Sequence, residues 1–419
     1  MVKLPVLEVS YTGYLLMSQI KKRIAVFFGG RSPEHDVSVV TGLQVLQAID
    51  QSRFQAFPVY VAPDGKWYTG EILRKRESYL LDKSALDQVR QVTLDVTQIG
   101  KGALLPHKQG LFGGGRAEEF DVAVLAFHGL VGEDGGFQGL FEVAGIPYTG
   151  MRSMASALLM DKAATKHLLK SLGIPALPCA VLHRPAEGYL IPRTELETLL
   201  KDIGFPCIIK PSHLGSSIGV AKADNMDEVL ACLPGVFEYD DTAIVEPFVQ
   251  NLVEYNVAVA RFSRETRTSA IEKPKTSSEL LDFKQKYLSG GGSKSGGSKS
   301  PGQISQGMLS LTRELNPKLD EKAESNIRRW ALLLFEALGN SGSPRIDFIG
   351  NAKTGEIWMN EVNPIPGSFG YFLWEAAAKP ILFAELMTNL IEEALDNARR
   401  RKLPKDPVPV DARLLRRPV

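Results

Sequence analysis

Four polar side chains near the C-terminal end of the chain are spaced for chemistry. Arg345 and Asp347 are two residues apart, and so are Glu361 and Asn363. Because strand side chains alternate between two faces, each pair points to one face, and a turn containing Gly355 makes the two strands a hairpin. Asp, Glu and Asn offer oxygen ligands only, which suits Mg²⁺. The arginine cannot bind a cation and would grip an anion shared with the metal, such as a phosphate.

The same four residues also have a plainer interpretation. Polar residues that alternate with Ile346, Phe348 and Val362 are typical of any half-exposed antiparallel sheet, where they form surface ion pairs. Taken alone, the pattern favours that interpretation. The hypothesis of a metal site therefore depends on what else the chain carries.

A lysine and a loop rich in Gly and Ser lie between two predicted strands. Residues 210–220 read Lys-Pro-Ser-His-Leu-Gly-Ser-Ser-Ile-Gly-Val. Backbone N–H groups and hydroxyls of such a loop can wrap phosphate oxygens, while the lysine supplies a positive charge. This is not the strand–loop–helix phosphate motif, because the lysine precedes the glycines. As an isolated pattern, a hairpin turn rich in Ser and Gly is the commoner case.

Two more loops follow buried strands in the first third of the chain. A strand over 24–28 ends at two glycines, and Glu34 follows at the start of a helix; a strand over 122–127 ends at His128. Strands that end in Gly-rich loops before helices indicate an open parallel sheet, whose ligands gather beyond the strands' carboxyl ends. A lone histidine is more often structural than catalytic. Together, the four patterns are consistent with a nucleotide, Mg²⁺ and a small charged substrate.

Composition sets the class of protein. The chain has 419 residues, of which 44% are apolar and 23% charged, which suggests two or three globular domains. Lys and Arg number 49 against 48 Asp and Glu, and this balance argues against nucleic-acid binding through bulk positive charge. Three cysteines without a CxxC pair suit a reducing cytoplasm. No run approaches the ~18 apolar residues of a membrane span. We therefore expect a soluble, cytoplasmic protein without a membrane partner.

The pattern of predicted helices and strands changes near residues 150 and 255, where we predict domain boundaries. Between them lie short strands over 206–210, 218–221 and 243–246, and a further strand over 255–262 crosses the second boundary. Residues 289–302 contain only Gly, Ser, Lys and Pro, which predicts a mobile loop that cannot pack. Periodic apolar residues predict helices over 156–171, 321–338 and 381–400.

Six segments in a fixed order resemble the D-alanine–D-alanine ligases. They are residues 28–38, 128–140, 145–150, 160–162, 210–217 and 286–288, and the predicted hairpin followed by a Pro-Gly pair resembles that family's Arg-x-Asp and Glu-x-Asn signature. The resemblance implies an α/β protein of ATP-grasp architecture, with ATP held between the last two of three domains. The expected division is an extension 1–21, an N-terminal parallel-sheet domain 22–150, a central domain 151–255, and a C-terminal domain 256–419 with a mobile loop at 287–307.

The resemblance also implies roles in nucleotide binding. Lys162, Lys210 and Ser217 match residues that contact ATP phosphates, and Lys286 matches one that reaches the transferred phosphate. Residues that match the adenine and ribose contacts are Glu246, Phe248, Val249 and Glu254. Asp347, Glu361 and Asn363 match the ligands of two Mg²⁺ ions, a site that Mn²⁺ could also occupy.

A second set of roles concerns the amino acids. Glu34 matches the residue that binds the ammonium of the first substrate, in a hydrogen-bonded set with Ser216 and Tyr287. Arg345 and the Gly367 N–H match the groups that stabilise the oxyanion. We expect three further substrate contacts, namely His128, Ser368 and Tyr371.

Two departures from the family pattern fall beside this hairpin. Asn363 is followed by Pro-Ile-Pro where the family commonly has a small hydroxyl residue. The segment 368–374, Ser-Phe-Gly-Tyr-Phe-Leu-Trp, replaces a stretch in which a serine usually anchors the carboxylate of the acceptor. The identity of the acceptor is therefore the part of the function that the sequence specifies least.

The interpretation that follows is an ATP-dependent ligase. It would join two D-alanine molecules through an acyl phosphate, release ADP and phosphate, and serve peptidoglycan precursor synthesis, with a homodimer implied by the resemblance. One alternative is a related ligase with a different D-amino or hydroxy acid as acceptor. Another is a nucleotide-binding protein without catalysis, although the presence of both lysines and all four hairpin residues argues against it.

Overall fold

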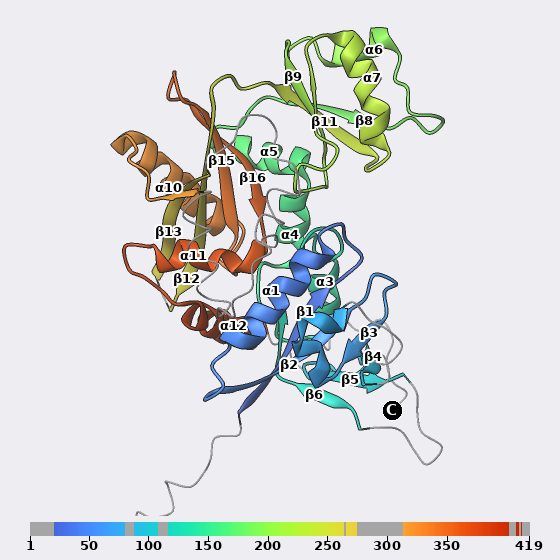
Figure 1. The fold of residues 1–419 in the computed structure, drawn as a ribbon, viewed down its shortest axis with the longest axis vertical. Coiled ribbons are helices and arrows are strands. Elements are labelled where there is room, and N and C mark those ends of the chain that lie inside the picture. The colour runs from blue at the N-terminus through green and yellow to red at the C-terminus, as the bar shows by residue number, and fades with distance from the viewer. Residues whose placement is uncertain are drawn as a thin grey trace, which may run out of the picture.

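Three β-sheets organise the chain (Figure 1). The computed structural model describes residues 21–79, 88–107, 116–263, 265–274, 313–401, 408–409 and 412. Lys286, Tyr287, the loop 287–307 and nearly all of the extension 1–21 lie outside the described residues. Among the helices of the described part, none is long and apolar enough to cross a membrane.

The N-terminal sheet has seven strands in the order β6-β5-β4-β3-β2-β1-β7. Its strands are β1 (Lys22–Gly29), β2 (Phe54–Val61), β3 (Trp67–Thr69), β4 (Arg90–Leu94), β5 (Gly102–Pro106), β6 (Glu118–Phe120) and β7 (Val122–Leu125). β1 pairs in parallel with β2 and β7, which confirms the parallel sheet predicted there. β3 to β6 extend it as antiparallel strands that the sequence did not predict, because strands this short carry too few residues for a periodic pattern.

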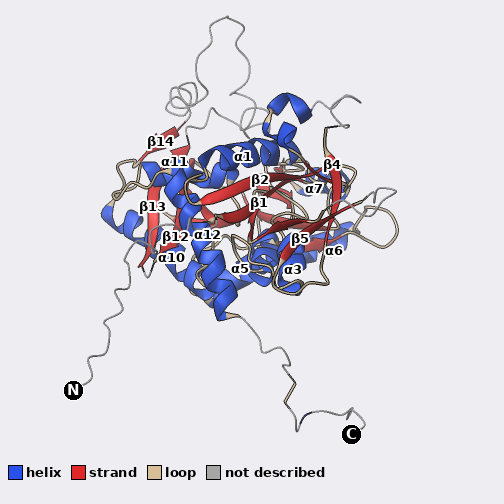
Figure 2. Cartoon of the chain, turned by 90° about the horizontal axis from the view of Figure 1, so that it is seen from below, coloured by secondary structure: helices blue, strands red, loops and turns tan. Residues whose placement is uncertain are grey.

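Helices cover both faces of this sheet. α1 (His35–Ala48) packs on the face of β1 that bears Phe28, where Gly42 lets the helix lie against the ring. α3 (Gly136–Val143) packs on the opposite face, where the Phe141 ring centroid lies 5.1 Å from that of Phe27. Figure 2 shows α1 and α3 on the two sides of β1 and β2. The loops after β1 and β7 therefore emerge together at one edge of the sheet. β3 is followed by two short 3₁₀ helices, which are η2 (Glu71–Arg74) and η3 (Arg76–Tyr79).

The central sheet is antiparallel, with the strand order β10-β9-β11-β8. Its strands are β8 (Ala180–His183), β9 (Cys207–Pro211), β10 (Ala221–Ala223) and β11 (Thr242–Pro247). Helices α6 (Arg193–Leu199) and α7 (Met226–Phe237) pack on it through a separate apolar core that includes Leu196, Ile209, Val229 and Phe237.

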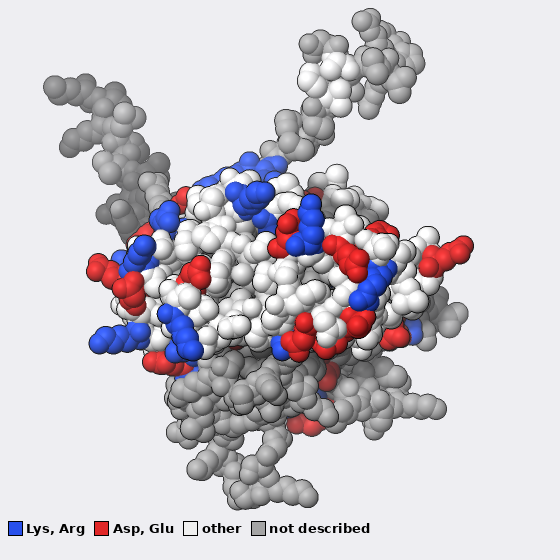
Figure 3. Space-filling view, turned by 90° about the horizontal axis from the view of Figure 1, so that it is seen from above, with Lys and Arg blue, Asp and Glu red and all other residues white. Residues whose placement is uncertain are grey.

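The face of the molecule seen in Figure 3 carries basic and acidic side chains interspersed, which fits the near-zero net charge.

The helix predicted over 156–171 is broken in two. α4 (Ser153–Met160) ends just before Asp161, whose backbone is extended at φ −95° and ψ 108°, and α5 (Lys162–Ser171) begins directly after Asp161. The Asp161 carboxylate accepts the N–H groups of Ala163 and Ala164 and so caps α5. The break places Lys162 on the first turn of a new helix.

The C-terminal sheet has five antiparallel strands in the order β14-β13-β12-β15-β16. Its strands are β12 (Leu252–Phe262), β13 (Glu265–Pro274), β14 (Arg313–Leu315), β15 (Arg345–Asn351) and β16 (Ile357–Asn363). α10 (Glu321–Ala337) covers the face that bears Ile346 and Phe348, in one core with residues of α4 and α5. The other face carries the polar residues of the predicted hairpin. β12 runs across the boundary predicted at residues 255–256.

The last elements join the C-terminal sheet to the N-terminal domain. η4 (Gly367–Gly370) and α11 (Tyr371–Glu375) follow β16, and α12 (Phe383–Arg400) ends the described helices. Residues of α11 and α12, such as Trp374 and Leu390, share the apolar core of β1, β2 and β7. Residues far apart in the sequence therefore form one rigid contact between the first and last parts of the chain.

The contact between α1 and β1 can be tested at Gly42. A Cβ added there would lie 2.3 Å from Cγ of Phe28, so we expect Gly42→Ala to lower the free energy of unfolding by about 1–3 kcal/mol through overpacking. Gly235 in α7 is a matched control, since a Cβ there meets no heavy atom within 4 Å and alanine should stabilise the helix by about 1 kcal/mol. Thermal unfolding midpoints measure both changes. A Gly42→Ala variant more stable than the wild type would contradict this packing.

Candidate active site

The four predicted hairpin residues lie together. Asp347 is opposite Glu361 in the register of β15 and β16, and Arg345 is opposite Asn363. Asp347 accepts hydrogen bonds from Nε and Nη2 of Arg345, both at 2.7 Å, and from Nδ2 of Asn363 at 3.0 Å. The strand alternation predicted from the sequence is confirmed. Three oxygen-bearing side chains and a guanidinium therefore converge on one face of the sheet.

A β-bulge in the hairpin adds a residue to this group. Asp347 pairs with Glu361 and Phe348 with Met359, which leaves Asn360 as the extra residue of β16. The Asn360 Oδ1 accepts a hydrogen bond of 3.2 Å from Nζ of Lys210. The bulge thus brings the lysine at the end of β9 against the hairpin, a contact that strand alternation alone could not predict.

A buried carboxylate holds two lysines beside the hairpin. Glu246 of β11 lies 2.7 Å from Nζ of Lys210 and forms a second ion pair with Lys166 of α5. All three residues are less than a tenth exposed. Burial acts to raise the pKa of Glu246, but the two ammonium groups outweigh it and lower that pKa. Burial acts to lower the pKa of Lys210, but the negative charge of Glu246 acts against burial, and that pKa is raised.

Lys162 points to the same region from the start of α5. Its Nζ donates to the C=O of Leu214 and lies 3.9 Å from Oε2 of Glu361. Burial lowers the pKa of this ammonium, although the negative charge of Glu361 acts to raise it. Lys166, one helical turn further on, was not predicted. Its spacing of four from Lys162 would have placed it on the same helix face.

Residues expected to bind the base and the ribose lie beyond β11. The Phe248 N–H donates to the C=O of Pro206 at 3.0 Å, and Nζ of Lys222 lies 5.1 Å from the centroid of its ring. Val249 follows in the same connection to β12. Glu254 lies on β12 two residues before Asn256, which is opposite Asp347, so it shares the sheet face of the hairpin residues. Glu246 itself is turned toward the lysines.

The loop after β9 reaches the N-terminal domain. Ser216 and Ser217 have left-handed backbones, with φ of 54° and 58°, and Oγ of Ser216 donates to the carboxylate of Glu34. The loop after β7 approaches the same group, since a Cβ on Gly129 would lie 2.7 Å from Oε2 of Glu34. Two residues that the sequence places 182 positions apart are thereby joined, as the resemblance implied for Glu34 and Ser216.

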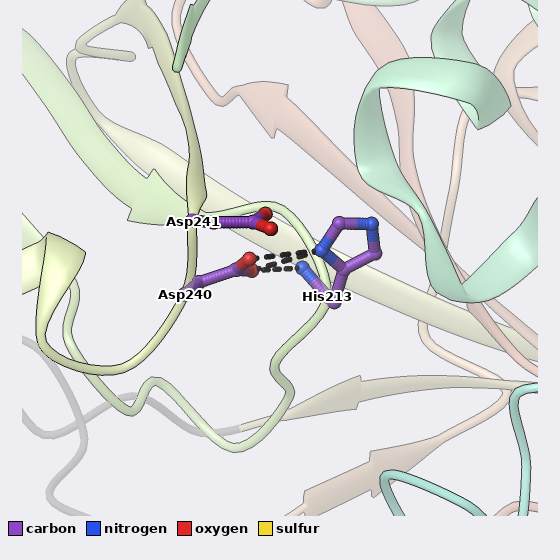
Figure 4. Close-up of side chains that lie close together, drawn as sticks. All are labelled: His213, Asp240 and Asp241. Atoms are coloured by element: carbon purple, nitrogen blue, oxygen red, sulfur yellow. Dashed lines mark hydrogen bonds and ion pairs between the residues drawn. The ribbon is translucent and has the colours of Figure 1, made fainter. Parts of the chain in front are cut away.

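His213 anchors the start of this loop (Figure 4). Its N–H donates to Oδ2 of Asp240 at 2.7 Å, and its ring Nδ1 lies 3.0 Å from Oδ1 of the same carboxylate. Nε2 lies 3.7 Å from Asp161, the cap of α5. The hydrogen bond to Asp240 raises the pKa of the imidazole. The loop is therefore fixed at one end to the element that bears Lys162.

His128 lies buried between the first and last parts of the chain. Its Nδ1 is 2.8 Å from the C=O of Ile365, and its Nε2 is 2.7 Å from Oγ1 of Thr41. Burial lowers the pKa of His128 to about 4, so the ring is neutral at pH 7. The neutral ring then donates from Nδ1 to the carbonyl and accepts at Nε2 from the threonine. Both nitrogens have protein partners, and substrate contact by His128 stays a prediction.

The turn after β16 is held by α1. The Ser368 N–H donates to Oγ1 of Thr41 at 3.1 Å, and the Ser368 hydroxyl donates to the side chain of Gln44. Ser368 has a left-handed backbone, with φ of 51°, directly after Gly367. The Tyr371 ring stacks on Phe383, with centroids 5.0 Å apart. Substrate contacts of Ser368 and Tyr371 stay predictions, as do the roles of Lys286 and Tyr287 outside the described residues.

The architecture and this cluster define a class of enzyme. The antiparallel central and C-terminal sheets, with lysines and a carboxylate hairpin facing each other, form the ATP-grasp fold. Family models described as "D-ala D-ala ligase N-terminus" and "D-ala D-ala ligase C-terminus" match residues 23–151 and 168–392. The chain belongs to the D-alanine–D-alanine ligase family.

Sequence relatives span almost the whole chain. The D-alanine–D-alanine ligase of Thermosipho melanesiensis is 31% identical over 393 residues, which cover 94% of this chain and 98% of the relative. That of Thermosipho africanus is 32% identical over 379 residues, covering 90% and 95%. The likeness therefore extends over almost the whole chain rather than one domain.

Solved structures share the same arrangement. The D-alanine–D-alanine ligase of Coxiella burnetii matches with a TM-score of 0.71 at 24% identity, covering 91% of this chain and 96% of that one. The VanG D-Ala:D-Ser ligase of Enterococcus faecalis matches with a TM-score of 0.70 at 27% identity, covering 89% and 99%. The first likeness supports the fold alone. The second comes from an enzyme whose name specifies a different acceptor.

The pairing of Glu246 with two lysines generates a stability prediction. We expect Glu246→Gln to lower the free energy of unfolding by about 3–5 kcal/mol, because it leaves two buried ammonium groups without a counter-charge. Glu118→Gln is a matched control at the surface, where that carboxylate also pairs with two arginines and should contribute only about 0–1 kcal/mol. Denaturant unfolding of both variants gives the comparison. Equal effects would show that burial adds nothing to the central cluster.

Proposed function

We propose that the chain catalyses the ATP-dependent ligation of two D-alanine molecules and releases ADP and phosphate, in peptidoglycan precursor synthesis. The observation that carries the proposal is the hydrogen bond from Ser216 to Glu34. It joins a buried carboxylate suited to an ammonium group to the loop suited to phosphate. A substrate amino acid bound at Glu34 would therefore have its own carboxylate beside the phosphate-binding lysines.

The chemistry begins with an unreactive carboxylate. Direct attack of an amine would have to expel oxide, so the first D-alanine must be activated by transfer of the γ-phosphoryl group of ATP. Lys162 and Lys210 would bind the phosphates, with Ser217 of the same loop. Their positions against Glu361, Asn360 and Glu246 support this role, since each ammonium is already held at the edge of the hairpin.

The donor set at the hairpin fits a hard divalent cation. Asp347, Glu361 and Asn363 present only oxygen ligands on adjacent strands, which suits Mg²⁺ and would also accept Mn²⁺. Two ions are expected from the family resemblance. When bound, they would offset the negative charge of the phosphates and of the transferred group. Glu254, on the same sheet face, would bind the ribose, and Phe248 and Val249 would line the adenine pocket with Glu246.

The second step joins the two amino acids. The amine of the acceptor attacks the acyl carbon, the C–O bond to phosphate breaks, and inorganic phosphate leaves with both bonding electrons. Arg345 and the Gly367 N–H would stabilise the oxyanion that develops on the carbonyl oxygen. By the family resemblance, Lys286 would act on the transferred phosphate and Tyr287 on the Glu34–Ser216 pair. His128, Ser368 and Tyr371 would contact the amino acids.

The acceptor is the open part of this proposal. Ser368 and Tyr371 stand near the place of the usual serine anchor, but the Ser368 hydroxyl donates a hydrogen bond to Gln44 and the Tyr371 ring stacks on Phe383. A different D-amino acid or a hydroxy acid is therefore the second candidate, and the similarity to a D-Ala:D-Ser ligase favours it. A homodimer and a cytoplasmic location stay predictions from the sequence.

The direct experiment measures ADP release. The purified chain should release ADP only when ATP, Mg²⁺ and D-alanine are all present, and mass spectrometry should identify D-alanyl-D-alanine as the product. A parallel series with D-serine and D-lactate identifies the acceptor. ATP binding without amino-acid-dependent ADP release would favour a non-catalytic nucleotide-binding protein.

The proposed metal ligands can be tested by charge removal. We expect Asp347→Asn and Glu361→Gln each to lower kcat by about a hundred- to a thousand-fold, as for loss of one group that stabilises charge in the transition state. Asp320→Asn is the control, because Asp320 caps α10 and asparagine caps equally well. Thermal midpoints should stay near that of the wild type. Near-normal turnover of both hairpin variants at limiting Mg²⁺ would contradict the assignment.

A further inference from the structure

One buried carboxylate outside the predicted set bridges the two ends of the chain. Glu133, in the loop between β7 and α3, is 4% exposed. Its Oε2 accepts the N–H of Gly129 at 2.7 Å, and its Oε1 accepts the N–H of Ile365 at 2.8 Å. No cation contacts it among the ion pairs of the described residues. A carboxyl group buried without a counter-ion is costly, and the two backbone donors offset part of that cost.

The same peptide is held from its other side. The carbonyl of Ile365 accepts from Nδ1 of His128 at 2.8 Å, so Glu133 binds the N–H of this residue and His128 its C=O. His128 in turn accepts from Thr41, whose oxygen accepts the Ser368 N–H. The N–H and C=O of Ile365 are therefore both fixed by the loop between β7 and α3. A helix of the same domain fixes the residue three positions later.

We infer that Glu133 is a positioning residue that, with His128 and Thr41, fixes the 365–368 turn as the floor of the acceptor subsite. The turn lies directly after the proposed metal ligand Asn363 and carries Gly367 between the two fixed points. Where Ile365 and Ser368 are held determines where the Gly367 N–H points and how close α11 stands to the hairpin. The inference rests on the proposed function, since it names the part of that site that selects the acceptor.

The charged groups around Glu133 are consistent with a positioning role. Burial raises the pKa of Glu133 to about 8, and the nearby carboxylate of Glu34 adds to the shift. Arg345 and the two backbone N–H groups act in the opposite direction. The carboxylate is thus close to the groups that bind the first amino acid and the oxyanion, yet its oxygens are occupied by the backbone.

The test variant is Glu133→Gln. Glutamine has the same shape but only one acceptor oxygen, so one of the two N–H groups would face an NH₂ group. We expect the KM for the second D-alanine to rise by about five- to a hundred-fold, because one buried backbone N–H loses its acceptor. The KM for ATP should stay within about two-fold, because no nucleotide contact changes. In a mixture of D-alanine and D-serine, the fraction of D-alanyl-D-serine should rise as the turn loosens.

The product ratio makes the experiment independent of folding yield, because unfolded enzyme contributes to neither product. Thr41→Val reaches the same turn by another route, since it removes the hydroxyl that links His128 to Ser368, and it should shift the ratio in the same direction. Glu393→Gln is the control. That buried glutamate also accepts a backbone N–H, from Gly342 at 2.7 Å, but holds no part of the turn.

Two results would overturn the inference. One is an acceptor KM and product ratio like those of the wild type in both Glu133→Gln and Thr41→Val. The other is an equal change in Glu393→Gln, which would mean that any buried glutamate matters. A wild-type enzyme that forms no dipeptide would instead contradict the proposed function, so the two failures are distinguishable.

Discussion

The burial of three ammonium groups at the proposed phosphate site governs the centre of this molecule. Two lysines of α5 and one of β9 are nearly inaccessible to water, and each is within reach of a carboxylate. An unpaired ammonium in such a place would cost several kcal/mol, on the order of the whole net stability of a domain. Glu246 and Glu361 make that burial possible. The elements that carry them, β11 and β16, therefore have to lie beside α5.

Polar side chains also join the three sheets to one another through their loops and strand ends. Ser216 reaches Glu34, Lys210 reaches Asn360, and Glu133 reaches Ile365, so each sheet is tied to another by polar side chains. Apolar cores hold each sheet to its own helices, and α11 and α12 share the core of the N-terminal sheet. The polar ties need this rigid background, since a hydrogen bond positions a group only when both partners are themselves fixed.

Much of this could be predicted from the sequence where the determinant is local. Alternation placed Arg345 and Asp347 on one strand face, and periodic apolar residues located α10, because a strand or helix imposes its period on its own residues. Buried apolar runs located β1 and β7. Contacts between distant loops have no such period. Nothing local relates Glu133 to Ile365, 232 positions later, or Lys166 to Glu246. The break at Asp161 was missed because apolar periodicity continues across it.

An isotope measurement shows whether this site activates a carboxylate by phosphoryl transfer. D-alanine labelled with ¹⁸O in its carboxylate is incubated with ATP and Mg²⁺, and the inorganic phosphate is analysed by mass spectrometry. We expect one labelled oxygen in the phosphate for each dipeptide formed, since the carboxylate oxygen leaves with the phosphoryl group. Dipeptide formed with unlabelled phosphate, or with the label in AMP, would contradict it.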